Sequence, residues 1–232
     1  MPRATVLITG SNRGIGLELA RQYAADGWDV LATCRDPSNA AELAELAAQS
    51  PDLAIEPLDV SDWPAVAALG ARLAARPLDV VLANAGVWGG SEQGLEQLEP
   101  DAWLATLAVN TVGPVMLLRA LLPSLRRGSG RRFVAISSGM GSIGANRSGG
   151  WIAYRSSKAA LNAAVRSAGL DLAGQGIVAA VLSPGWVRTD MGGSNATLSV
   201  EESASALRSL IARLGPTETG GFYDVDGGEL AW

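Results

Sequence analysis

The chain has 232 residues, of which 48% are apolar and 18% charged, a composition typical of a globular protein with a sizeable core. Its net charge of −5 argues against a general affinity for nucleic acid, which requires a basic face. Histidine is absent, so histidine-based triads and most zinc sites are excluded, and we expect no metal site. The single cysteine, Cys34, cannot form an intrachain disulfide, which fits a cytoplasmic location.

Apolar β-rich runs alternate with alanine-rich helical stretches along the chain. In chain order the predicted elements are strand 4–9, helix 16–27, strand 29–34, helix 39–49, strand 53–60, helix 62–75, strand 79–84, helix 101–126, strand 132–137, helix 152–173, strand 177–183, helix 200–214 and strand 221–225. Ser38 or Asn39 is the expected N-cap of the second helix. The alternation predicts one doubly wound parallel sheet of about seven strands, with helices on both faces and a single domain over residues 1–232. No apolar run approaches 18 residues, so we expect neither a membrane span nor a cleaved leader.

Four segments are expected to line a ligand crevice, because loops at the carboxyl ends of parallel strands meet at one edge of the sheet. Three of them, 86–99, 139–150 and 190–199, are loops that follow strands. The fourth, TGSNRGIG (9–16), joins the first strand to the first helix. Its glycines allow a tight turn and close approach of the backbone to a pyrophosphate at the helix N-terminus. A glycine loop alone favours this interpretation only weakly, and the alternative is an ordinary turn between a strand and a helix.

Tyr154 and Lys158 form the most informative pair of residues. Lys158 is the only lysine, whereas the other 17 basic residues are arginine. Residues four apart share one face of a helix, so both side chains should point into the crevice. An adjacent ammonium favours the phenolate and should lower the pKa of Tyr154 toward working pH. The ammonium of lysine is a compact head with three donors, whereas the guanidinium of arginine is a wide planar group. The alternative is that a lone lysine fell here by chance.

Together with NAG (84–86), Asn110, SS (137–138), YRSSK (154–158) and PGWVRT (184–189), the glycine loop makes the chain resemble the short-chain dehydrogenase/reductase family. The resemblance covers essentially the whole chain and implies a Rossmann-type fold that binds NAD(P). The segments ISSGMGSI, SGGWIAY and GGFYDVDGGELAW are similar to those of small carbonyl-reductase-like members related to the C-factor signalling proteins.

The resemblance implies a catalytic set of Ser138, Tyr154, Lys158 and Asn110. Tyr154 would be the general acid for carbonyl reduction, Lys158 would bind the nicotinamide ribose, and a serine would hydrogen-bond the substrate oxygen. Asn110 would kink its helix and hold a water that leads from Lys158 to solvent, although it can also be an ordinary buried polar residue. The commonest serine position falls on Gly141, so we choose Ser138, at a rigid strand end, over Ser142.

The resemblance also implies a set of cofactor-binding residues around the crevice. They are Gly10, Asn12, Arg13, Gly14, Ile15, Gly16, Arg35, Asp59, Val60, Asn84, Ala85, Gly86, Tyr154, Lys158, Pro184, Gly185, Val187 and Thr189. Asn84 and its neighbours would line the adenine side and stabilise the sheet. Asp59 would accept a bond from the adenine amino group, or simply cap a turn. The backbone of Val187 and the Thr189 side chain would hold the nicotinamide carboxamide.

The form of the cofactor depends on the end of the second strand. The family's acid, which would bind the ribose 2′-hydroxyl of NAD, falls near Cys34, and Arg35 follows. Arg35 and Arg13 would suit a 2′-phosphate, which favours NADP(H). Asp36 lies 20 residues after Gly16, a spacing that fits NAD(H), but it precedes Pro37 and so is expected in a turn.

Large apolar residues follow the crevice motifs and predict an apolar or aromatic carbonyl or alcohol substrate. They are Trp88, Met140, Trp151, Trp186 and Met191. The tryptophans could equally pack loops or a subunit contact. The leading hypothesis is an NADPH-dependent carbonyl reductase, and the alternative is a nucleotide-binding signalling or sensor protein with incidental turnover. The family resemblance also implies a homodimer or homotetramer formed through helices 101–126 and 152–173.

Overall fold

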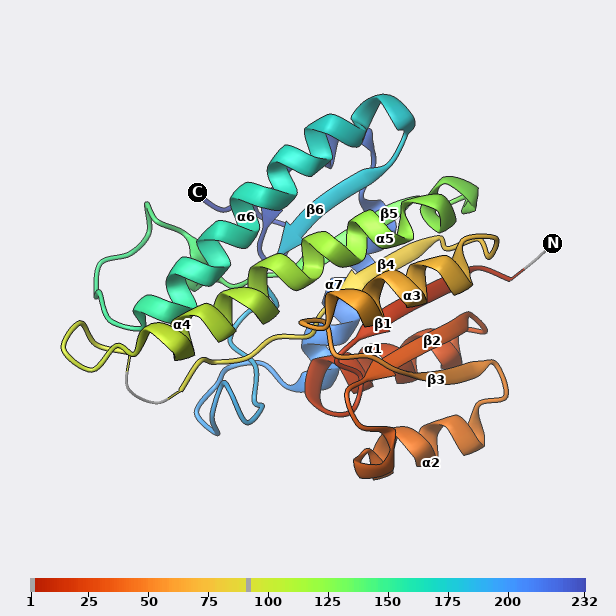
Figure 1. Cartoon of the computed structure of the whole chain (residues 1–232), viewed down its shortest axis with the longest axis horizontal. Helices are drawn as coiled ribbons and strands as arrows, with labels where there is room; N and C mark the ends of the chain where they lie inside the picture. The colour runs from red at the N-terminus through yellow and green to blue at the C-terminus, as the bar shows by residue number, and fades with distance from the viewer. Residues whose placement is uncertain (1–2, 91–92) are drawn as a thin grey trace.

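The computed structural model describes residues 3–90 and 93–232, and seven parallel strands of this part form one sheet (Figure 1). The strands are β1 (Thr5–Thr9), β2 (Asp29–Cys34), β3 (Leu53–Pro57), β4 (Val80–Ala83), β5 (Arg132–Ile136), β6 (Val178–Leu182) and β7 (Phe222–Tyr223). Their order, β3-β2-β1-β4-β5-β6-β7, confirms the predicted doubly wound sheet. Because the order reverses between β1 and β4, a ligand crevice is expected at the carboxyl ends of these two strands.

Helices cover both faces of the sheet. They are α1 (Gly14–Ala25), α2 (Ala41–Gln49), α3 (Trp63–Leu73), α4 (Pro100–Leu107), α5 (Gly113–Arg127), α6 (Ile152–Leu172) and α7 (Val200–Arg213). Side chains alternate between faces along a strand, so Leu7 and Ile8 of β1, both fully buried, enter different cores. Leu7 packs in the core under α3, α5 and α6, the face seen in Figure 1, and Ile8 packs in the core under α1, α2 and α7.

Several element ends differ from the sequence predictions. The third strand stops at Pro57, three residues early, and β7 has only two residues. The expected N-cap of α2 is wrong: α2 begins after Ala40 and has no side-chain cap. The reason is a short 3₁₀ turn, η1 (Pro37–Asn39), which uses Ser38 and Asn39 and is capped by Asp36, whose carboxylate accepts a bond from the Ser38 amide at 3.0 Å.

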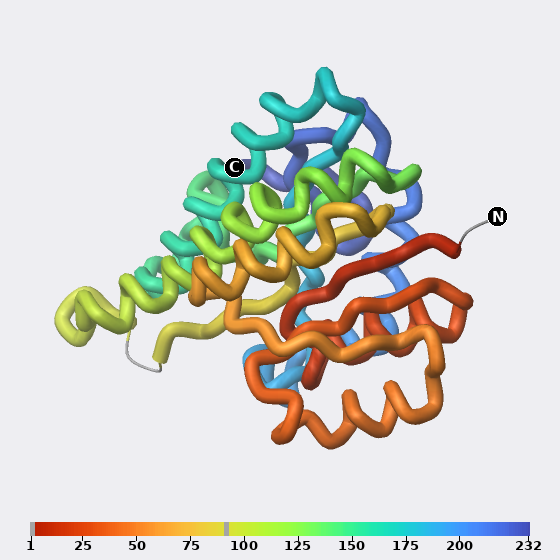
Figure 2. Tube along the Cα trace, turned by 45° about the vertical axis from the view of Figure 1, so that its right-hand side comes forward, coloured from red at the N-terminus to blue at the C-terminus, as the bar shows by residue number. Residues whose placement is uncertain are grey.

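The predicted helix 101–126 is continuous over 100–127 but contains a π-helical segment, η2 (Ala108–Val112), between α4 and α5. Figure 2 shows α4 reaching beyond the strand ends. By length and composition alone this helix could cross a membrane. That is weak support for a span, because a core helix passes the same test, and here Leu117, Leu121 and Leu125 are buried against the sheet. The expected absence of a membrane span stays a prediction.

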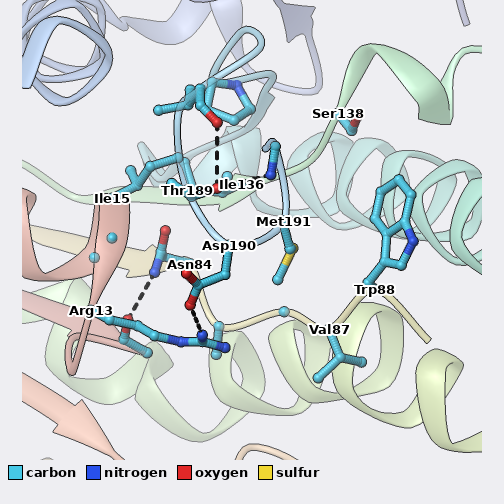
Figure 3. Close-up of a pocket in the computed structure, with 18 of the residues that line it drawn as sticks. Arg13, Ile15, Asn84, Val87, Trp88, Ile136, Ser138, Thr189, Asp190 and Met191 are labelled. Atoms are coloured by element: carbon cyan, nitrogen blue, oxygen red, sulfur yellow. Dashed lines mark hydrogen bonds and ion pairs between the residues drawn. The ribbon is translucent and has the colours of Figure 1, made fainter. Parts of the chain in front are cut away.

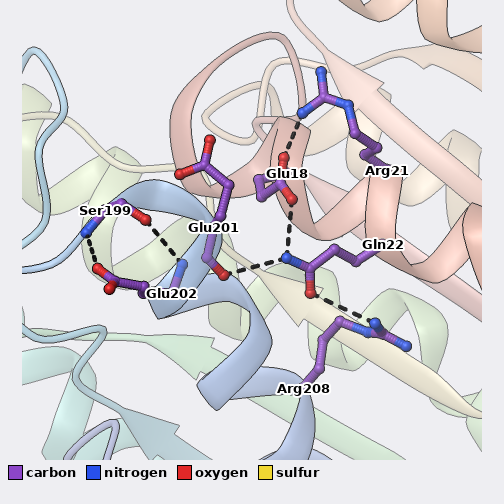
Figure 4. A network of polar contacts seen from close by, with 7 residues as sticks. All are labelled: Glu18, Arg21, Gln22, Ser199, Glu201, Glu202 and Arg208. Atoms are coloured by element: carbon purple, nitrogen blue, oxygen red, sulfur yellow. Dashed lines mark hydrogen bonds and ion pairs between the residues drawn. The ribbon is translucent and has the colours of Figure 1, made fainter.

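A polar network holds α1 against α7 (Figure 4). The buried Glu18 accepts bonds from Gln22 at 2.9 Å and from Arg21, and Gln22 also donates to the backbone oxygen of Glu201 at 3.3 Å. Ser199 and Glu202 form a capping box at the start of α7. Because α1 begins in the glycine loop and α7 follows the loop after β6, the network positions two segments of the crevice relative to each other.

Candidate active site

A cleft of about 1330 Å³ lies at the carboxyl edge of the sheet (Figure 3). The glycine loop and the segments after β2, β3, β4, β5 and β6 line it, together with the first turns of α6. Figure 3 shows Arg13 from the glycine loop, Ser138 from the end of β5 and Thr189 from the loop after β6 around this one space. All residues that the sequence predicted to hold the cofactor line this cleft.

Two predicted site residues do not line the cleft. Asn110 is fully buried behind it, in the π-helical segment η2. Trp151 is 39% exposed and lies against Trp88, with ring centroids 5.0 Å apart. Trp88, Met140, Trp186 and Met191 do line the cleft.

The glycine loop forms a cradle that side chains would fill. Gly10 and Gly14 have φ angles of +69° and +55°, which favour glycine. A Cβ on Gly16 would come within 2.2 Å of the Gly10 carbonyl oxygen. Asn84 donates to the carbonyl oxygens of Thr9 and Gly10 at 2.9 and 3.2 Å and so ties the ends of β1 and β4 together. Gly14, Ile15 and Gly16 at the start of α1 line the cleft, and a helix N-terminus without side chains in the way fits a dinucleotide pyrophosphate.

Tyr154 and Lys158 enter the cleft from one face of α6, as their spacing predicts. Both are buried, with 7% and 4% of their surface exposed. The Lys158 ammonium donates to the Ile136 carbonyl oxygen at 2.8 Å and lies 5.8 Å from the centre of the Tyr154 ring.

Burial dominates the titration of both side chains. It raises the pKa of Tyr154, against which a hydrogen bond with Ser138 acts in the lowering direction, and it lowers the pKa of Lys158 to about 8. We expected Lys158 to lower the pKa of Tyr154, and the structure reverses that expectation. The physical reason is that the phenolate loses its hydration in the buried site, and the only opposing contribution to the Tyr154 pKa from the described residues is the hydrogen bond with Ser138.

The neighbouring serines take separate places. The Ser138 hydroxyl lines the cleft and accepts a bond from the Met140 amide at 3.1 Å. Ser142 is buried outside the cleft, where it accepts from the Ala145 amide at 3.0 Å. Ser137 donates to Asn162 of α6 at 2.6 Å, facing the helix as the strand alternation predicted. Of the two serines weighed for catalysis, only Ser138 lines the cleft, and its catalytic role stays a prediction.

Asn110 connects the loop after β4 to α6. Its oxygen accepts from the Val87 amide at 2.8 Å, and its nitrogen donates to the Val87 carbonyl oxygen at 2.8 Å and to Ser157 at 3.0 Å. The predicted local distortion of the helix is present as the π-helical turn. Such turns are frequent at functional sites.

At the cofactor end, the arginines have different partners. Both arginines line the cleft, and Arg13 in addition pairs with Asp190, a contact that the sequence did not predict. Asp36 accepts bonds from the Ser38 amide and hydroxyl at 3.0 and 2.5 Å, so it sits in a turn as expected. Asp59 likewise caps a turn, accepting from the Ser61 amide and hydroxyl at 2.8 and 2.6 Å, and also lines the cleft.

Several lining residues were missed by sequence reasoning. They include Asn39, Glu42, Asp190, Asp224 and Leu230. Asp190 directly follows the PGWVRT motif, so its place in the sequence could have predicted that it lines the cleft. Asp224 and Leu230 lie within the segment GGFYDVDGGELAW, whereas Glu42 stands next to none of the motifs, and only the folded chain brings Glu42 to the cleft.

Residues 4–198 match the family model described as short chain dehydrogenase. The chain is 44% identical over 156 residues to C-signal of Myxococcus xanthus, covering 67% of this chain and 93% of that protein. The structure is similar to carbonyl reductase Sniffer of D. melanogaster, with a TM-score of 0.93, 37% identity and full coverage of both chains. It is also similar to NADPH-bound carbonyl reductase from chicken fatty liver, with a TM-score of 0.91, 33% identity and full coverage of both chains.

The cleft, the tyrosine–lysine pair and these similarities agree with one another. The resemblance drawn from the motifs is confirmed, including its carbonyl-reductase-like and C-factor-like character. The chain therefore belongs to the short-chain dehydrogenase family and is an oxidoreductase that interconverts CH–OH and C=O groups with a nicotinamide dinucleotide.

Proposed function

We propose that the protein uses NADPH to reduce an apolar or aromatic ketone or aldehyde, with Tyr154 as the proton donor. One observation carries the proposal: the side chains of Ser138, Tyr154 and Lys158 line the same cleft as the glycine cradle. The similarity to an NADPH-bound carbonyl reductase supports it.

The bound cofactor would supply the hydride that reaches the carbonyl carbon. Ser138 would donate a hydrogen bond to the carbonyl oxygen and so orient it toward Tyr154. The phenol of Tyr154 would then give its proton to that oxygen as the alcohol forms. Because burial raises the pKa of Tyr154, the phenol holds its proton at neutral pH, which suits the reductive direction.

Other residues would hold the cofactor. The glycine loop would bind the pyrophosphate, and Lys158, which gives one of its three N–H donors to Ile136, would offer the others to ribose hydroxyls. Arg35 would bind the 2′-phosphate. Arg13 can join it only by leaving Asp190, so we assign Arg35 the larger share. The backbone of Val187 and the Thr189 side chain would hold the carboxamide.

The walls beside Tyr154 favour an aromatic or apolar substrate. The Trp88 ring lies on the Tyr154 ring, with centroids 4.3 Å apart, and Trp151 extends this aromatic row to the surface. Trp186 and Met191 are 55% and 44% exposed where they line the cleft. A flat apolar substrate could pack against the exposed side chains of Trp186 and Met191 and remove their apolar surface from water.

The alternative is a nucleotide-binding signalling or sensor protein whose turnover is incidental. The similarity to C-signal favours it. The complete set of Ser138, Tyr154 and Lys158 around the cleft weighs against it, because binding alone needs no proton donor.

The test is a panel of aromatic and aliphatic ketones and aldehydes, with NADPH and NADH compared by absorbance. Tyr154→Phe should lower kcat by about 10²–10⁴-fold, the usual contribution of general acid catalysis. It should leave the fluorescence titration with NADPH unchanged, since only the phenolic hydroxyl is removed. No turnover by the parent on any carbonyl, or full turnover by the variant, would favour the sensor.

We also propose that the protein is a cytoplasmic homo-oligomer, as its sequence led us to expect. Leu104 of α4, Val112 of η2 and Leu170 of α6 are exposed apolar residues on the helices expected to form subunit contacts. We expect a dimer or tetramer by light scattering and a cytoplasmic location by cell fractionation. A monomer at micromolar concentration would contradict the first expectation.

A further inference from the structure

The helix that carries Tyr154 begins without a cap of its own. The N-cap residue of α6 is Trp151, whose backbone is left-handed at φ +53° and whose side chain caps nothing. The first backbone N–H groups of a helix lack partners within it. The Tyr154 N–H is one of them, because Tyr154 is the third residue of α6.

Gln93, 61 residues earlier in the chain, provides the missing cap. Its side-chain oxygen accepts a hydrogen bond from the Tyr154 amide at 2.8 Å. Its backbone oxygen accepts one from the Ile152 amide at 3.1 Å. Gln93 is only 2% exposed, so water has little access to compete for these bonds. Ser157 donates to the Tyr154 carbonyl oxygen at 2.8 Å, so side chains hold both backbone groups of Tyr154.

The same Gln93 amide also holds Trp88 over the tyrosine. Its nitrogen donates to the backbone oxygens of Trp88 and Gly90 at 2.7 and 2.9 Å. The Trp88 ring lies 4.3 Å from the Tyr154 ring, tilted by 40°, and lines the cleft, where Figure 3 shows it. The buried Gln93 side chain therefore accepts a hydrogen bond from α6 and donates two to the loop that carries Trp88.

We propose that Gln93 is a positioning residue for carbonyl reduction. It fixes the start of α6, so that the Tyr154 phenol stays in place, and it fixes Trp88 as the wall against which the substrate packs. The inference rests on the proposed function for its kinetic consequences. The physical reason is that proton transfer depends steeply on geometry, so a small shift of the phenol slows the reaction.

Two variants of Gln93 separate these two tasks. Gln93→Glu keeps an acceptor for the Tyr154 amide but cannot donate to the two loop carbonyls. We expect kcat within a few-fold of the parent and KM for an aromatic ketone such as acetophenone raised about tenfold or more, because Trp88 is released. Gln93→Met removes all three side-chain bonds at similar volume, and kcat should also fall about tenfold or more. Gln97→Met, an exposed residue of the same loop, is the matched control and should change neither constant.

Amide hydrogen exchange at Tyr154 tests the cap without any turnover. The amide should be protected in the parent and in Gln93→Glu, and should exchange at least tenfold faster in Gln93→Met. Equal exchange rates in the parent and in Gln93→Met would overturn the proposed cap. If Gln93→Met does not fold, fast exchange of the Tyr154 amide in the parent would overturn the cap as well. If Gln93→Glu has the kcat and KM of the parent, the proposal that Gln93 positions Trp88 is wrong. A parent that reduces no carbonyl would refute the proposed function, while the exchange experiment would still decide the cap.

Discussion

Replacing Lys158 by methionine should make the protein more stable while removing its activity. The side chain is 4% exposed, and burial lowers its pKa from 10.5 to about 8. At about 1.36 kcal/mol per pKa unit, holding the charge in the folded chain costs about 3 kcal/mol at pH 7. Methionine removes that cost but loses the bond to Ile136, worth about 1 kcal/mol. The net gain of about 2 kcal/mol should raise Tm by about 4–8 °C.

The stability difference between Lys158→Met and the parent should depend on pH, because burial lowers the pKa of Lys158. In the parent, the unfolded chain binds a proton at Lys158 more tightly than the folded chain does, so its stability rises with pH. The cost is fully present below about pH 8 and disappears as pH rises toward 10.5. The advantage of Lys158→Met should therefore shrink by about 2 kcal/mol between pH 7 and pH 10.

Urea unfolding at a series of pH values measures this difference directly. Lys158→Arg is the matched control, because arginine keeps the charge at every pH tested and should give no gain in stability. Fluorescence titration should show weaker NADPH binding in both variants. If Lys158→Met is no more stable than the parent at pH 7, or if the difference is constant with pH, the buried ammonium is not the cause.

Two further predictions concern the cofactor and the serine. Arg35→Asp should shift the ratio of NADPH to NADH affinity about tenfold or more toward NADH, because one charge-assisted bond to the 2′-phosphate, worth about 1.5–3 kcal/mol, is lost; a parent that already prefers NADH would contradict this assignment. Ser138→Ala should lower kcat/KM strongly on a ketone that Ser142→Ala turns over normally, and the opposite outcome would make Ser142 the catalytic serine.

Local patterns were sufficient to predict most of the elements and the central motif. The strands were visible because continuous apolar runs are what a sheet buried on both faces requires. The pairing of Tyr154 with Lys158 followed from the helical repeat alone, and the glycine loop from its place between a strand and a helix. These features depend on residues within a few positions of one another, so the sequence by itself determined them.

Tertiary structure decided what depends on distant segments. Gln93 caps a helix that begins 59 residues later, and Arg13 pairs with Asp190, 177 residues away, so no local pattern could have predicted either contact. The titration of Tyr154 was predicted in the wrong direction for the same reason. The neighbouring charge is visible in the sequence, whereas the depth of burial, which sets the sign, is a property of the packed chain.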